Sequence, residues 1–122
     1  MKPRINIDSE RSMVTVKLEE DMSLAEVREF LEELKAVVGK FNEGGVPFSM
    51  LIDAESKTFE DLNAVRELSQ GLRGTLKTCS IKRYAVYRPQ NAYLNDDEIT
   101  QTENIKNFLT LDDARTWLLQ AD

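Results

Sequence analysis

The chain has 122 residues, of which 41% are hydrophobic and 31% charged, a composition typical of one globular domain covering residues 1–122. A net charge of -6, from 16 basic and 22 acidic residues, disfavours binding to nucleic acid or to an anionic membrane surface. The absence of histidine and the single cysteine exclude the commonest general base, a disulfide framework and a Cys/His zinc site. We therefore expect a protein without a metal or cofactor.

The amino-terminal segment Met1–Asp8 has no apolar signal core, and no later apolar run is long enough to cross a bilayer. These features predict a cytoplasmic protein that does not insert into membranes.

The first elements are predicted as a β-hairpin and a long helix. Ile5–Ile7 and Met13–Leu18 alternate apolar with polar residues around a segment rich in turn formers. Ser23-Leu-Ala-Glu26 is a capping box, which predicts a helix beginning there. One apolar stripe at three- and four-residue steps then ends before Gly44-Gly45 and comprises Leu24, Val27, Phe30, Leu31, Leu34, Val37, Val38 and Phe41.

A buried strand and a second helix follow. Val46–Ile52 is almost continuously apolar, which predicts a central strand covered on both faces. After a polar segment, Thr58 is predicted to cap a helix that ends at Gly74. The next strand is predicted over Cys79–Tyr87, with Tyr84 and Val86 on one face and their neighbours on the other.

The carboxyl-terminal third predicts one more strand and one more helix. Asn91–Gln101 has the composition of one or two helical turns without a continuous apolar stripe. Ile105–Leu109 predicts a short strand, and Thr110 is placed to cap a last helix whose buried face includes Trp117 and Leu118.

Strands that alternate with helices imply right-handed crossovers and a mostly parallel sheet. The fold class is therefore predicted as α/β, with a mixed sheet of four to five strands, an amino-terminal β-hairpin whose first strand is antiparallel at one edge, and three to four helices.

This order of elements, with the closing segment Phe108-Leu-Thr-Leu-Asp-Asp-Ala-Arg-Thr-Trp-Leu118, resembles the STAS superfamily, in particular its SpoIIAA-like branch of anti-sigma-factor antagonists and SEC14-related domains. The resemblance covers nearly the whole chain. It implies a SpoIIAA-like (STAS) fold and a bacterial regulatory protein that binds a protein partner.

In phosphorylatable STAS proteins, a turn of the type Phe-x-Asp-Ser-Ser-Gly follows the central strand, which itself ends in an aspartate. Asp53, Phe59 and Asp61 match this pattern, but Leu62 stands at the phosphoacceptor position. Because leucine has no hydroxyl group, we expect a module that is not regulated by phosphorylation there. Ser56 and Thr58 are the only replacement acceptors nearby, but a loop serine and an N-cap threonine explain these two residues better.

Ligands of open α/β sheets bind outside the carboxyl ends of the strands. The candidate partner surface therefore comprises Asp53, Glu55, Ser56, Thr58, Glu60, Asp61 and Leu62. A magnesium cluster of Asp53, Glu55 and Asp61 is the alternative, but solvated acids near a helix N-terminus explain these residues better.

The function predicted from these residues is a non-catalytic protein-interaction or regulatory module, a monomer or homodimer, because no nucleophile has a partner base. Cys79 in particular has no histidine to activate it. The alternative is a carrier or sensor of a small apolar or lipid-like molecule, with Met13, Met22 and Met50 lining a pocket of the SEC14 type rather than packing in the core.

Overall fold

The computed structural model describes residues 3–18, 22–54, 62–78, 81–87 and 104–120. Five strands in these ranges form one sheet: β1 (Arg4–Asp8), β2 (Met13–Lys17), β3 (Phe48–Asp53), β4 (Ile81–Tyr87) and β5 (Ile105–Phe108). Three helices accompany them: α1 (Leu24–Glu43), α2 (Leu62–Thr78) and α3 (Leu111–Leu118). None of the described helices is long and apolar enough to cross a membrane.

The strands follow one another across the sheet in chain order, from β1 to β5. β1 pairs antiparallel with β2, and every later neighbour is parallel. The prediction of a mixed, mostly parallel sheet with an antiparallel hairpin at one edge is therefore confirmed.

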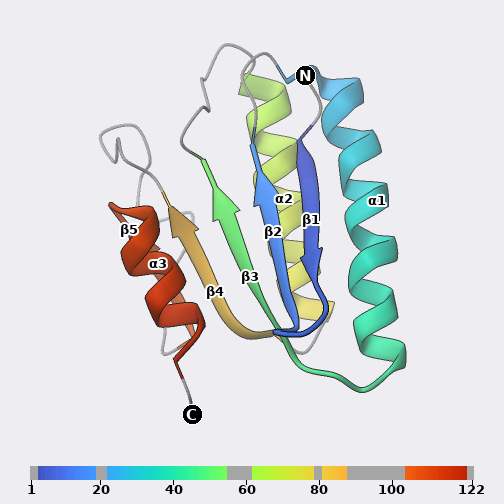
Figure 1. The fold of residues 1–122 in the computed structure, drawn as a ribbon. Helices are drawn as coiled ribbons and strands as arrows, with labels where there is room; N and C mark the ends of the chain where they lie inside the picture. The colour runs from blue at the N-terminus through green and yellow to red at the C-terminus, as the bar shows by residue number, and fades with distance from the viewer. Residues whose placement is uncertain (1–2, 19–21, 55–61, 79–80, 88–103, 121–122) are drawn as a thin grey trace.

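Helices cover the two faces of the sheet unequally. α1 and α2 lie side by side on one face, and α3 lies on the other, where it contacts β3, β4 and β5 (Figure 1). No described element covers that second face over β1 and β2 (Figure 1). Within the described ranges, this part of the sheet face is therefore uncovered beside the outer edge of β1.

The larger core lies between the sheet and the pair α1 and α2. Its fully buried members include Val27, Phe30 and Leu34 of α1 with Tyr84 of β4. The smaller core joins Leu51 and Ala85 of the sheet to Ala114 and Leu118 of α3. β3 thus contributes alternate side chains to both cores, as its continuous apolar sequence predicts.

Helix ends follow the local sequence at two of the predicted caps. Ser23 precedes α1 in a complete capping box, and the Thr110 hydroxyl oxygen accepts a hydrogen bond from the Asp113 N–H at 3.3 Å before α3. The predicted end of the second helix at Gly74 is wrong, because α2 continues to Thr78. Leu72 and Thr75 are buried on either side of Gly74, and this packing outweighs the cost of one glycine in a helix, about 1 kcal/mol.

Two predicted features fall outside the described residues. They are the N-cap at Thr58 and the helical turns over Asn91–Gln101.

Candidate functional site

The carboxyl edge of the sheet brings together the ends of several elements. β2 ends at Lys17, β3 at Asp53 and β4 at Tyr87, while α1 and α2 begin near the same edge, at the top of Figure 1. Lys17 is the register partner of Asp53, and Asp53 is that of Tyr87. A cation, a carboxylate and a phenol therefore form one row across three strands, on the sheet face that α3 also occupies.

Main-chain hydrogen bonds fix this row. The Leu18 N–H donates to the Asp53 carbonyl oxygen at 2.9 Å, and the Ala54 N–H donates to the Tyr87 carbonyl oxygen at 3.0 Å. The side chain of Asp53 is half-buried, so it lies at the surface with its backbone held by both neighbouring strands. The main chain of Asp53 is therefore fixed at the carboxyl edge.

Two of the residues predicted for the partner surface lie in the described part of the chain. Asp53 ends β3, and Leu62 is the first residue of α2. Leu62 thus lies in the first described turn of α2. The remaining predicted residues lie outside the described part: Glu55, Ser56, Thr58, Glu60 and Asp61.

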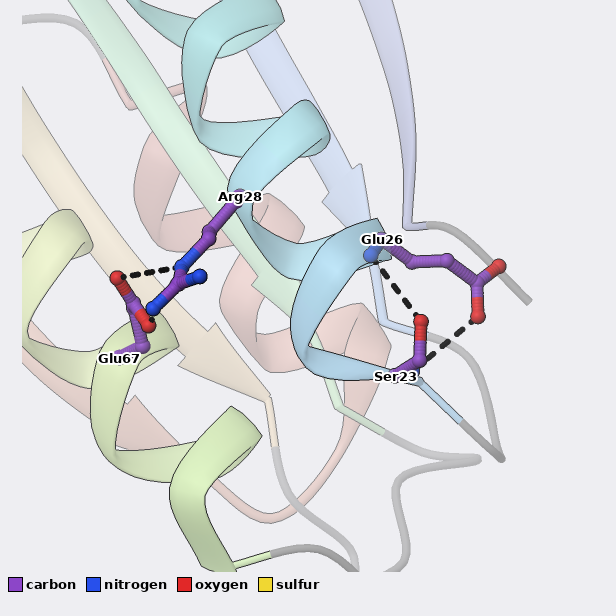
Figure 2. A network of polar contacts seen from close by, with 4 residues as sticks. All are labelled: Ser23, Glu26, Arg28 and Glu67. Carbon is purple, nitrogen blue, oxygen red and sulfur yellow. Dashed lines mark hydrogen bonds and ion pairs between the residues drawn. The ribbon is translucent and has the colours of Figure 1, made fainter.

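Polar contacts fix the start of α1 and its contact with α2 (Figure 2). The Ser23 hydroxyl oxygen accepts from the Glu26 N–H at 3.1 Å, and the Ser23 N–H donates to Glu26 Oε1 at 3.2 Å. The pKa of the Glu26 carboxyl is lower than its ordinary value of 4.5. The main cause is the hydrogen bond from the Ser23 main chain, and the second is a hydrogen bond with the Ser23 side chain. This carboxylate is occupied in capping the helix.

An ion pair links the two helices of the larger core. Arg28 Nε lies 3.2 Å from both carboxylate oxygens of Glu67 (Figure 2). Both side chains are exposed, so the pair contributes little to stability, about 0 to 1 kcal/mol. The ion pair joins α1 to α2 and places one positive and one negative charge side by side near the carboxyl edge.

The amino edge of the sheet holds a hollow that the sequence does not predict. Its volume is about 590 Å³. Four separate segments line it: Glu10–Ser12, Pro47–Ser49, Lys82 and Leu118–Gln120. Because no local pattern unites these segments, the hollow becomes visible only once the strands are assembled.

The lining combines two cations, Arg11 and Lys82, with one acid, Glu10, and with the exposed apolar side chain of Leu119. This mixture suits polar as well as apolar groups. It differs from the methionine-lined pocket considered for a lipid-like ligand.

The three methionines of that hypothesis do not lie together. Met22 and Met50 belong to the larger core beneath α1 and α2, whereas Met13 packs against the smaller core on the other face. The sheet itself separates them, so core packing explains these side chains.

No group of three acidic or cysteine side chains within the described ranges is arranged to hold a metal ion. Among the described residues of the carboxyl edge, the arrangement offers fixed charges for recognition. No family model matches the chain, and no curated protein matches it significantly.

Proposed function

We propose that this chain is a cytoplasmic, non-catalytic protein-interaction or regulatory module that resembles a SpoIIAA-like (STAS) anti-sigma-factor antagonist. The observation that carries the proposal is that Leu62 belongs to the helix α2, which follows a β3 strand that ends at Asp53. In the STAS pattern these are the positions of the phosphoacceptor and of the strand-end aspartate. The sequential α/β sheet agrees with the resemblance at the level of fold class.

The proposed partner surface runs from Asp53 to Leu62. Leu62 carries no hydroxyl group, while Glu60 and Asp61 precede it with permanent negative charge. The module is therefore constitutive: two separate carboxylates imitate part of the charge of a phosphate without a kinase. A partner of this surface presents cationic or donor groups toward the segment.

The test is to capture the partner with the whole chain in a lysate of the source organism and then to measure the affinity of the purified pair. The double variant Glu60→Lys/Asp61→Lys should bind at least about tenfold more weakly than the wild type, because buried or rim charges that become repulsive cost this much or more.

A matched control is available in the first turn of α3, which carries Asp112 and Asp113. Asp112→Lys/Asp113→Lys changes the net charge equally at another helix start and should retain full affinity. Equal affinities for wild type and the Glu60→Lys/Asp61→Lys variant would contradict the proposed surface.

Native mass spectrometry of the purified chain separates the proposal from its alternative. A copurifying lipid-like molecule would favour the carrier function. Hydrolysis of a phosphate or acyl ester that disappears in Asp53→Ala would contradict both functions.

A further inference from the structure

Among the described elements, no further strand pairs with the outer edge of β1, which lies beside the part of the sheet face that α3 leaves uncovered. β1 is the first strand in the sheet order, and among the described elements only β2 pairs with it. Ile7 on this strand is 45% exposed. Unpaired strand edges template pairing with another strand unless another element or charges block them.

The direction of the backbone groups of β1 follows from two bonds between β2 and β3. Ser12 O accepts from Ser49 N at 2.9 Å, and Leu18 N donates to Asp53 O at the same distance. Even-numbered residues of β2 therefore point their backbone groups toward β3, and odd-numbered ones point toward β1.

The register then assigns the backbone groups of β1. The odd-numbered β2 residues are opposite Arg4, Asn6 and Asp8, which therefore bond to β2. The N–H and C=O groups of Ile5 and Ile7 consequently point away from the sheet, toward the free edge.

The side chains of β1 are self-complementary in an antiparallel pairing. Its sequence is Arg-Ile-Asn-Ile-Asp. When two copies pair about Asn6, Arg4 of each lies opposite Asp8 of the other, and Ile5 lies opposite Ile7. The isoleucines are then the pairs that exchange backbone hydrogen bonds.

The charged pairs fall on non-hydrogen-bonded positions, where opposite Cα atoms are only about 4.5 Å apart and side chains approach closely. Pairing about Ile5 or Ile7 instead places no opposite charges within the strand against each other.

The charges of the neighbouring strand favour the same partner. Arg4 is opposite Lys17 on the open face, and Lys17 is opposite Asp53. This row across the sheet reads acid, cation, cation. Asp8 from a second copy extends the row with an acid beside Arg4, and opposite charges on facing strands attract.

We propose that a second copy of this chain binds here, with β1 pairing antiparallel to β1 about a two-fold axis at Asn6. The two five-stranded sheets then form one continuous sheet, and the exposed Ile7 of each copy is covered by Ile5 of the other. A two-fold axis makes the contact closed, so it produces dimers and no fibres.

The strand contact is short, with five residues on each side. It is therefore at the small end of specific interfaces, and the dimer is expected to dissociate in the micromolar to millimolar range. This inference is independent of the proposed partner surface, which lies at the carboxyl edge.

Sedimentation equilibrium of the whole chain from micromolar to millimolar concentration tests the proposal. The wild type should show a reversible monomer–dimer equilibrium. Arg4→Asp and Asp8→Arg each place like charges opposite one another and should weaken dimerisation at least about tenfold. The double variant Arg4→Asp/Asp8→Arg should restore it, because the opposite charges are exchanged.

Two control variants separate other effects. Arg11→Ala removes the exposed ion pair that Asp8 makes with Arg11 at 3.2 Å and should leave the dimer intact. Lys35→Asp changes the net charge as Arg4→Asp does, at an exposed site on α1, and should also leave it intact.

Ile7→Pro provides a readout that does not depend on charge. The N–H of Ile7 points away from β2, so proline at this position removes a hydrogen-bond donor of the proposed contact. The hydrogen bonds between β1 and β2 remain. This variant should be a folded monomer by circular dichroism. A wild type that stays monomeric at millimolar concentration, or a double variant that dimerises no better than the single variants, would overturn the proposal.

Discussion

Arg83 of β4 holds the carboxyl end of α3 against the sheet through Trp117. Its Nη1 donates to the Trp117 carbonyl oxygen at 2.7 Å and to that of Gln120 at 2.8 Å. The guanidinium carbon also lies 5.6 Å from the centre of the Trp117 ring. One cation therefore meets the last carbonyl groups of the helix, where a positive charge is most favourable, and the face of an aromatic ring.

Replacing Arg83 should therefore destabilise the protein through α3. Arg83→Met removes charge-assisted hydrogen bonds and should cost about 1 to 3 kcal/mol in urea unfolding. Arg73→Met, at an exposed position of α2, should change the unfolding free energy by less than about 0.5 kcal/mol. Equal effects of the two substitutions would show that Arg83 does not hold the helix.

Two glycines of α2 should respond oppositely to alanine. A Cβ atom on Gly71 would lie 2.5 Å from the methyl carbons of Leu31, whereas one on Gly74 meets nothing within 4 Å. Gly74→Ala should stabilise the protein by about 0.5 to 1 kcal/mol through helix propensity. Gly71→Ala should not stabilise the protein, because Leu31 must move out of its packed position to make room for the new methyl group.

Thermal unfolding of both variants measures the difference, which we expect to be at least about 1 kcal/mol. Leu31→Ala provides the control background, because it removes the obstructing methyl groups and should make Gly71→Ala favourable there. A Gly71→Ala variant as stable as Gly74→Ala would place the two helices further apart than the structure does.

The capping box at Ser23 should make a pH-dependent contribution. Ser23→Ala should cost about 0.5 to 2 kcal/mol at neutral pH. The pKa of Glu26 is lower in the folded protein than its ordinary value of 4.5, so the contribution of its carboxylate is present above that value and lost as the pH falls through the folded pKa.

Glu26→Gln keeps an acceptor oxygen but cannot titrate. The wild type should therefore lose stability relative to this variant as the pH falls below about 4.5. Chemical unfolding at a series of pH values measures the effect, and parallel profiles of the two proteins would contradict it.

α3 should open before the larger core does. It is an eight-residue helix with two buried residues, Ala114 and Leu118, whereas α1 buries four of its twenty. Native-state hydrogen exchange should show lower protection for the amides of α3 than for the central amides of α1. The ring centroids of Phe108 and of Trp117, the only tryptophan, lie 5.5 Å apart. Trp117 fluorescence therefore gives an independent signal of the same opening.

Features encoded within a few residues were predicted well. The capping box at Ser23, the cap at Thr110 and the alternation of Tyr84 and Val86 with Ala85 and Tyr87 depend on short-range geometry, and the structure confirms each. The prediction that α2 ends at Gly74 is wrong because the burial of Leu72 and Thr75, which depends on the assembled core, outweighs the tendency of glycine to end a helix.

Features that join distant segments were not predictable in the same way. Arg83 follows Lys82 in the sequence, and its structural role appears only when Trp117, 34 residues later, lies beside it. The hollow at the amino edge likewise joins four segments. Of the candidate site, the sequence correctly placed Asp53 at a strand end and Leu62 in the helix that follows, because both follow from local patterns.

The strand order has a consequence for how the chain folds during synthesis. Each strand after β1 pairs with its predecessor, so every step extends an edge that already exists. A nascent chain can therefore complete β1, β2, α1 and β3 and begin its larger core while the later strands are still inside the ribosome. Because each strand pairs with the one synthesised before it, no early strand has to stay unpaired until a late strand is made. The edge to which the next strand is added is therefore exposed only briefly.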